Sequence, residues 1–153
     1  MEATEILEDL FNVPILSELS SQELKVVAPY WRYVFLEKSD ILFSEGDPAD
    51  AIYYVVEGEF IIYKDNNGAI PLELTHVKCG QFFGEQAVLE NSVRSGTLQA
   101  AEPSKILTLS KDGFYEIIDK YPHVGVILLK GLARYLSLQL RKTTGQYVAI
   151  CEG

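Results

Sequence analysis

The sequence has little of what metal-based or covalent chemistry needs: two cysteines, Cys79 and Cys151, and two histidines, His76 and His123, in 153 residues. The cysteines have no metal-ligand or disulfide-framework spacing, so we expect free thiols in a reducing compartment. Neither histidine has a second histidine near it, and no Ser-His-Asp or Cys-His arrangement is evident. The sequence therefore predicts neither a metal site nor an enzyme.

Basic residues are also scarce, because 13 Lys and Arg stand against 22 Asp and Glu and give a net charge of −9. This excess disfavours nucleic acids and polybasic membrane contacts as functions, since negative charge repels phosphate. Apolar runs are short: residues 124–129 are interrupted by Gly125 and fall far short of the ~20 residues that span a bilayer. The amino terminus lacks the pattern of a signal peptide, so we expect a cytoplasmic protein without membrane contact.

Apolar side chains, in contrast, are plentiful, with 48% hydrophobic and 11% aromatic residues in the chain, which favours a buried core over disorder. The length is typical of one domain, so we expect a single domain over residues 1–153. Residues 1–30 have the apolar spacing of helices. Ser20 and Glu23 have the spacing of a capping box, and Pro29 is expected to end the second helix.

Residues 31–110 have the pattern of a β-rich region. Short strand-like segments occur at residues 53–56, 60–63, 72–74 and 105–109, and turn residues occur at 45–48, 57–59, 65–68 and 78–80. Glycine and asparagine in these turns accept the positive φ that tight turns require. Closely spaced strands with such turns predict a mainly β fold with flanking helices, as a small barrel or jelly roll.

Helical periodicity returns after Ser110 and predicts C-terminal helices over residues 111–145, one at 111–120 and a long one from Pro122 to about Thr144. The long helix has a broad apolar stripe, which consists of Leu128, Leu129, Leu132, Ala133, Leu136 and Leu140. This stripe is wider than packing on one surface requires, which favours a homodimer through the helix. A helix that leaves some of its leucines exposed is the alternative.

Residues 80–97 have the pattern that carries most functional information. Gly84 and Glu85 precede a short helix-like run, whose free backbone N–H groups would attract an anion. The forked guanidinium of Arg94, later in the same loop, could pair with that anion and indicates a phosphate. Glu85 would accept a hydrogen bond from a sugar hydroxyl, so the implied ligand is a nucleotide. A surface ion pair between Glu85 and Arg94 is the alternative.

The run from Phe83 to Leu89, followed by Arg94-Ser95-Gly96-Thr97, resembles the phosphate-binding cassette of cyclic nucleotide-binding domains. The run from Glu45 to Gly58 resembles the strand-turn-strand signature of the same family, and the likeness extends over roughly residues 10–145. The resemblance implies an eight-stranded β jelly roll, or double-stranded β-helix, with N-terminal helices and a long C-terminal helix. It also implies that the barrel holds cyclic AMP or cyclic GMP, with no other cofactor.

The resemblance assigns a role to each matching residue. Arg94 would pair with the exocyclic phosphate oxygens, and Glu85 would bind the ribose 2′-hydroxyl. The backbone N–H groups of Gln86 and Ala87 would complete the phosphate cradle, and Ser95 would add a hydroxyl. The replacement Arg94→Ala is expected to weaken binding and to change stability little. The expected ligand-binding residues are Gly84, Glu85, Gln86, Ala87, Arg94 and Ser95.

Phe83 and Leu74 are expected to line the pocket, although core packing is the commoner use of a phenylalanine beside glycine. The family usually has Pro before the cassette arginine and Ala two positions after it, where this sequence has Val93 and Gly96. Both differences loosen the loop, so a weaker affinity is expected. Cyclic AMP is the favoured ligand, although Ser95 offers a hydroxyl similar to that of the Thr found in members that prefer cyclic GMP.

The sequence ends without the winged helix-turn-helix that follows this domain in regulators of the catabolite-activator type, so no DNA-binding domain is expected. The expected function is therefore a regulatory sensor that relays ligand binding through its C-terminal helices to an unknown effector protein. A degenerate fold that serves only for dimerisation or protein interaction is the alternative. Glu85 and Arg94 argue against it, because burying both without partners is costly and a nucleotide would satisfy both.

Overall fold

The computed structural model describes residues 2–152, and the side chains of residues 2–4, 86–88 and 146–152 lie outside this description. The expected free thiol of Cys151 belongs to that last group. The helices are α1 (Glu2–Phe11), η1 (Pro14–Leu16), α2 (Ser21–Val27), η2 (Ala28–Tyr30), α3 (Glu85–Glu90), α4 (Lys111–Lys120) and α5 (Pro122–Glu152), with η denoting 3₁₀ helices. The strands are β1 (Trp31–Leu36), β2 (Ile41–Phe43), β3 (Ala51–Glu57), β4 (Glu59–Lys64), β5 (Leu72–Lys78), β6 (Phe82–Phe83), β7 (Thr97–Ala100) and β8 (Ser104–Ser110).

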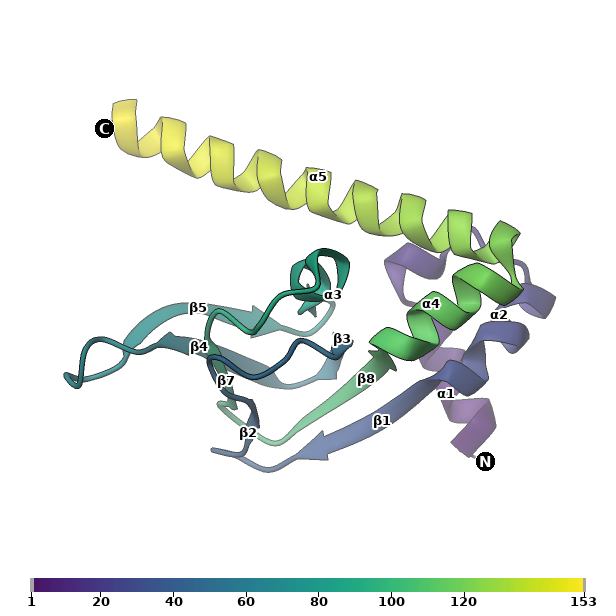
Figure 1. Cartoon of the computed structure of the whole chain (residues 1–153), viewed down its shortest axis with the longest axis horizontal. Helices are drawn as coiled ribbons and strands as arrows, with labels where there is room; N and C mark the ends of the chain where they lie inside the picture. The colour runs from purple at the N-terminus through teal and green to yellow at the C-terminus, as the bar shows by residue number, and fades with distance from the viewer. Residues whose placement is uncertain (1, 153) are drawn as a thin grey trace.

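The eight strands form two four-stranded antiparallel sheets, with the strand orders β1-β8-β3-β6 and β2-β7-β4-β5. This arrangement confirms the mainly β class and the eight strands predicted for a jelly roll. Helices lie on one side of the first sheet, and α5 extends along this layer and past α3 (Figure 1). The first sheet is therefore enclosed between the helices and the second sheet.

Strand β3 shows how the sequence produces this layering. Ile52 and Tyr54 belong to the core under the helices, whereas Tyr53 and Val55 belong to the core between the sheets. Successive side chains of a strand point to opposite faces, so an uninterrupted apolar run is suited to a strand covered on both faces. The same alternation separates Phe82 from Phe83 in β6 and places only the second between the sheets.

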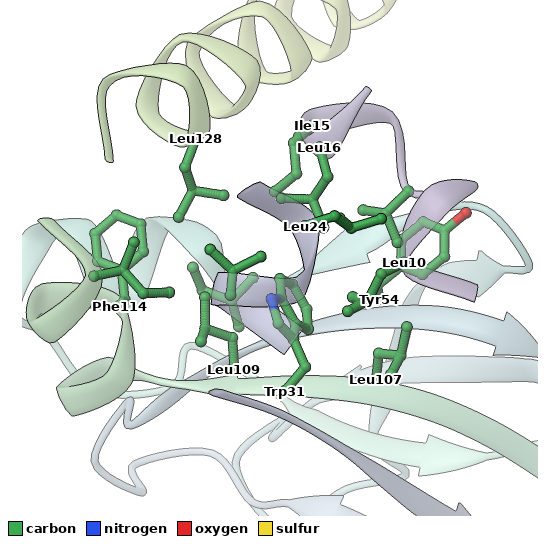
Figure 2. Close-up of a cluster of buried hydrophobic side chains, with 14 of the residues drawn as sticks. Leu10, Ile15, Leu16, Leu24, Trp31, Tyr54, Leu107, Leu109, Phe114 and Leu128 are labelled. Atoms are coloured by element: carbon green, nitrogen blue, oxygen red, sulfur yellow. The ribbon is translucent and has the colours of Figure 1, made fainter. Parts of the chain in front are cut away.

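The helical layer is held by close packing as well as by apolar burial. Figure 2 shows Trp31, Leu109 and Phe114 in the core beneath α5, with Leu128 of α5 pointing into it. A Cβ at Gly131 of α5 would lie 2.6 Å from the carbonyl oxygen of Ile15 in η1. Helix α5 and η1 therefore approach each other more closely than a larger residue would allow.

Several predicted local features are confirmed. Helix α4 has the predicted bounds, and the capping box of α2 forms through hydrogen bonds of 3.2 Å (Glu23 N to Ser20 Oγ) and 3.0 Å (Ser20 N to Glu23 Oε1). Helix α5 continues beyond the predicted end at Thr144. Within the described part of the chain, no helix has both the length and the apolar character that a membrane span requires.

In the structure, the broad apolar stripe predicted for α5 is divided between the core of the chain and an exposed face. Leu128 and Leu132 are buried in the core of the chain itself. Leu129 and Leu140 are exposed, with 38% and 67% of their surface accessible. A helix turns by about 100° per residue, so positions that all read as one apolar stripe can face different surroundings once the helix has docked.

Candidate functional site

The cassette, defined as residues 80–97, contains a glycine at position 84 that a larger residue could replace only with strain. Gly84 follows β6 and has a φ of 85°, in the left-handed region that favours glycine. A Cβ at this position would lie 2.5 Å from Nη1 of Arg94 and 3.0 Å from the carbonyl oxygen of Ala51. Gly84 therefore provides both the turn into α3 and the space for the arginine.

Arg94 is buried, with only 3% of its surface accessible. Its Nη2 donates a 2.9 Å hydrogen bond to the carbonyl oxygen of Ala51 and lies 3.7 Å from Oδ1 of Asp50. The guanidinium carbon lies 4.3 Å from the ring centroid of Phe43, which is cation–π distance. The Nε–H group is buried and has no hydrogen-bond partner in the described part of the chain. The side chain is thus fixed by protein contacts that leave one donor unsatisfied.

The two stretches that resemble the family meet in space around Arg94. The backbone N–H of Arg94 donates to Asp47 O at 2.8 Å, and its carbonyl accepts from Gly46 N at 2.9 Å. Pro48 and Val93 form a bridge between the same two segments. The turn before β3 therefore supports the cassette, a relation that their separation in the sequence does not reveal.

Glu85 begins α3 and is partly buried. Its Oε2 atom is buried and accepts no hydrogen bond from the residues that the structure describes. Burial raises the pKa of this carboxyl group, although a backbone hydrogen bond and the positive charge of Arg94 act in the opposite direction. Among the described side chains, the carboxylate within ion-pair distance of Arg94 is that of Asp50, so the alternative of a surface pair between Glu85 and Arg94 does not account for either residue.

A cavity of about 460 Å³ lies between the cassette, β5 and α5. Glu85, Arg94 and Ser95 line it together with Phe83 and Gly84. The backbone of Gln86 and Ala87 forms the first turn of α3, and their side chains lie outside the description. The cavity thus brings together the described residues that the sequence had grouped, apart from Leu74.

The prediction that Leu74 lines the pocket is wrong, because Leu74 does not belong to the cavity lining and has half of its surface exposed (50%). The pairing of β4 with β5 shifts register between Ile62 and Tyr63, opposite Thr75 and Glu73, which leaves Leu74 as the extra residue of a β-bulge. An extra residue disrupts the alternation of side chains along a strand. The cavity is lined by Thr75 in its place.

The structure gives a reason for glycine at position 96 that the sequence did not reveal. A Cβ there would lie 2.9 Å from the carbonyl oxygen of Tyr63 and 3.0 Å from Cγ2 of Ile62. The cassette therefore lies directly against β4 at this residue. The absence of a side chain allows a close approach, so Gly96 does more than loosen the loop.

Tyr135 and Gln139 of α5 also line the cavity, and the sequence reasoning missed both. The hydroxyl of Tyr135 accepts a 3.1 Å hydrogen bond from the backbone N–H of Phe82 and donates a 3.2 Å bond to its carbonyl oxygen. Leu128, Leu132, Tyr135 and Gln139 are spaced by four, three and four residues, which places them on one helix face. This spacing is the sequence signal that could have predicted that Tyr135 and Gln139 face the same side as the buried leucines.

Comparison with known proteins agrees with the resemblance that the sequence motifs indicated. The family model described as "Cyclic nucleotide-binding domain" matches residues 33–121. The cAMP-dependent protein kinase regulatory subunit of Yarrowia lipolytica is 35% identical over 109 residues, which are 71% of this chain and 28% of that protein. The cyclic AMP receptor protein of Thermus thermophilus is 26% identical over 123 residues, which are 80% of this chain and 57% of that protein.

Among solved structures, a cyclic nucleotide-binding domain from Methylobacillus flagellatus matches with a TM-score of 0.81 and 24% identity, covering 96% of this chain and 83% of that one. At this identity the likeness shows the fold. The chain spans only about a quarter of the length of the matched kinase regulatory subunit (28%).

Proposed function

Because this chain belongs to the cyclic nucleotide-binding domain family, we propose that it binds a cyclic nucleotide in the cavity beside Arg94. The observation that carries the proposal is a pair of unsatisfied buried polar atoms, Nε of Arg94 and Oε2 of Glu85, on two residues that line the same cavity. A buried polar group without a partner destabilises the fold. A nucleotide would supply a phosphate acceptor for the first atom and a hydroxyl donor for the second.

Each cassette residue has a defined part in this proposal. Arg94 pairs with the exocyclic phosphate, and Ser95 and the backbone N–H groups of Gln86 and Ala87 add hydrogen bonds to it. Glu85 accepts a hydrogen bond from the ribose 2′-hydroxyl. Charge-assisted bonds from a guanidinium that is already fixed lose little side-chain entropy on binding. The burial of Arg94 therefore supports its role in binding.

Cyclic AMP is the favoured ligand over cyclic GMP. The relatives from Yarrowia lipolytica and Thermus thermophilus are both named for cyclic AMP. Ser95 lines the cavity and could serve either nucleotide, because a hydroxyl can donate or accept.

Binding is relayed to an effector protein through α5 in this proposal. Tyr135 and Gln139 of α5 form part of the cavity wall, so a ligand in the cavity lies against the helix. A ligand can shift a conformational equilibrium only by its difference in affinity between two states. A helix that contacts the ligand directly can supply that difference.

A homodimer through α5 is also proposed, with a contact face that differs from the predicted stripe. Outside the buried face, α5 has exposed or half-buried apolar residues spaced alternately by three and four, which are Val126, Leu129, Ala133, Leu136 and Leu140. We call these five residues the seam. Such spacing is typical of the contact between paired helices, so a second copy of the chain is the proposed partner.

Calorimetric titration with cyclic AMP and cyclic GMP tests the binding proposal, with 5′-AMP as a control that lacks the cyclic phosphate. We expect saturable binding of at least one cyclic nucleotide at micromolar or lower concentration and no comparable heat from 5′-AMP. The absence of both heat and thermal stabilisation with either cyclic nucleotide would instead support the degenerate fold that acts only as an interaction module.

A further inference from the structure

Strand β6, which lies within the cassette, has an open edge. It is the last strand of the sheet β1-β8-β3-β6, and among the described strands it pairs with β3 alone. Gln81 directs its carbonyl toward β3, where it accepts a 3.0 Å bond from Val55 N. Backbone groups of successive residues in a strand point to opposite sides. Phe82 therefore directs its N–H and C=O away from β3, toward the edge that lacks a neighbouring strand.

Tyr135 of α5 satisfies both of these backbone groups with a single hydroxyl. The distances from its oxygen to the N and O atoms of Phe82 are 3.1 and 3.2 Å. A tyrosine hydroxyl can donate one bond while it accepts another, so it replaces a neighbouring strand at this residue. The two rings also pack edge to face, with centroids 5.2 Å apart and an interplanar angle of 71°.

Burial raises the pKa of Tyr135 above its ordinary value of 10.0. The hydroxyl therefore keeps its proton over the neutral range and remains able to donate to Phe82 O. The negative charge of Glu85, which lines the same cavity, raises the pKa further.

We propose that Tyr135 is a positioning residue that fixes the start of the cassette and α5 to each other. Phe82 lies directly before Phe83 and Gly84 in the chain, so holding its backbone restrains the turn that leads to Glu85. The same side chain forms part of the cavity wall. By holding α5 over the cavity, Tyr135 also slows the release of a bound nucleotide; this part of the proposal rests on the proposed function. The contact between α5 and β6 does not.

The position of Tyr135 along α5 explains why one contact has this effect. Before it, Leu128 and Leu132 are buried in the core, and Gly131 lies against η1. After it, Leu138 and Leu140 are exposed, and the helix continues past the cassette (Figure 1). Tyr135 thus lies where α5 leaves the helical core, and its two bonds restrain the following turns over the cavity.

The variant Tyr135→Phe tests the contact, because it keeps the ring against Phe82 and removes both hydrogen bonds. Tyr115→Phe is the matched control: this tyrosine of α4 is exposed and packs edge to face on Phe114. Hydrogen exchange without nucleotide should be roughly tenfold faster at Phe82 N and at residues 136–145 in Tyr135→Phe, the scale expected for lost hydrogen bonds. The amides of β3 and β8 should keep their wild-type protection.

Two exchange results would overturn the proposal. Unchanged protection at Phe82 and along α5 would show that the hydroxyl restrains neither element. A uniform acceleration that includes β3 and β8 would show a general loss of stability in place of a local release.

A second measurement tests the effect on the ligand. We expect a fluorescent cyclic AMP analogue to dissociate roughly tenfold faster from Tyr135→Phe than from the wild type or Tyr115→Phe, because the restraint over the cavity is weaker. An unchanged dissociation rate would overturn the role of Tyr135 in ligand retention. If the wild type binds no cyclic nucleotide, the proposed function fails, and the exchange experiment still decides whether Tyr135 holds α5 to β6.

Discussion

The guanidinium of Arg94 fills the space that a side chain at Gly84 would need, since a Cβ on the glycine would lie 2.5 Å from Nη1 of the arginine. The glycine also bends the chain into α3 with a φ of 85°. The first turn of the cassette and its cation therefore depend on each other. Two residues that look like separate motif positions in the sequence form a single structural unit.

This dependence predicts the effect of Gly84→Ala. The methyl group should displace the guanidinium and weaken cyclic AMP binding at least tenfold, in addition to about 1–2 kcal/mol of strain at positive φ. Gly80→Ala is a matched control, because Gly80 has a φ of 88° and, apart from its two chain neighbours, no described residue lies within 4 Å of the added Cβ. Thermal unfolding should show the cost of positive φ in both variants and a larger loss in Gly84→Ala, because displacing the guanidinium also breaks its bond to Ala51 O. Calorimetry should show the loss of binding only in Gly84→Ala. Equal binding by the two variants would contradict the steric explanation.

Arg94→Ala should lower both affinity and stability, which corrects the expectation that stability would change little. The buried guanidinium bonds to Ala51 O and packs on Phe43, so its loss should cost ~1–3 kcal/mol of unfolding free energy. The affinity for cyclic AMP should fall by roughly 30- to 1,000-fold. Urea unfolding and calorimetry measure the two effects. The control Arg134→Ala removes an exposed arginine that pairs with Glu18 on the surface and should change neither; normal nucleotide binding by Arg94→Ala would refute the phosphate role.

Much of the fold could be predicted because it depends on local patterns. The capping box at Ser20 and Glu23 fixes the start of α2, and the turn residues separate the strands. Helix α4 has the predicted bounds because the cap at Ser110 and the proline at 122 are both readable in the chain. The grouping of Glu85 with Arg94 around one cavity also followed from the sequence, through the spacing of a recognised motif.

The remaining features depend on contacts that no local pattern encodes. The buried position of Arg94 depends on its hydrogen bond to the carbonyl oxygen of Ala51, a residue of β3 that is distant in the sequence. The exposure of Leu74 comes from a bulge in the pairing of β4 with β5. The two faces of α5 are distinct only because η1 and the core cover one of them.

Glu85→Gln should separate the effect of the buried carboxyl group on stability from its proposed contact with the ribose. Burial raises the pKa of the carboxyl group, so the fold favours its protonated form, and the charge opposes folding once the pH rises through the raised pKa. The neutral amide should therefore raise the melting temperature at pH 7, and the difference should disappear below the ordinary pKa of 4.5. Melting curves over this pH range test the sign; a lower melting temperature of the variant at pH 7 would contradict it.

The same variant tests the ribose contact. Cyclic AMP should bind about tenfold more weakly to Glu85→Gln, since a charge-assisted hydrogen bond is replaced by a neutral one. The wild type should discriminate strongly between cyclic AMP and its 2′-deoxy analogue, and the variant should discriminate less. If the variant loses the same factor for both ligands, Glu85 does not contact the 2′-hydroxyl.

His76 should make stability depend on pH. Its Nε2 lies 2.6 Å from Oε1 of Glu73 and its Nδ1 lies 3.4 Å from Oε2 of Glu59, and these hydrogen bonds raise its pKa above 6.5. The fold thus favours the protonated imidazole, so its contribution is complete below pH 6.5 and is lost as the pH rises through the raised pKa. Urea unfolding should show this decrease in the wild type and a smaller one in Glu73→Gln. An imidazole that NMR finds titrating at or below 6.5 would contradict the assignment.

The seam on α5 predicts the oligomeric state. Leu140 belongs to the seam, whereas Leu138 lies on another face of the same helix, and both are exposed (67% and 52%). Leu140→Glu should place two carboxylates in the contact between paired helices and abolish the dimer, while Leu138→Glu should preserve it, although both variants introduce the same charge on the same helix. Sedimentation velocity at micromolar concentration measures the outcome. A wild-type protein that sediments as a single chain would refute the proposed dimer. Equal effects of the two variants would refute the proposed face, because a contact through the seam buries Leu140 and leaves Leu138 exposed.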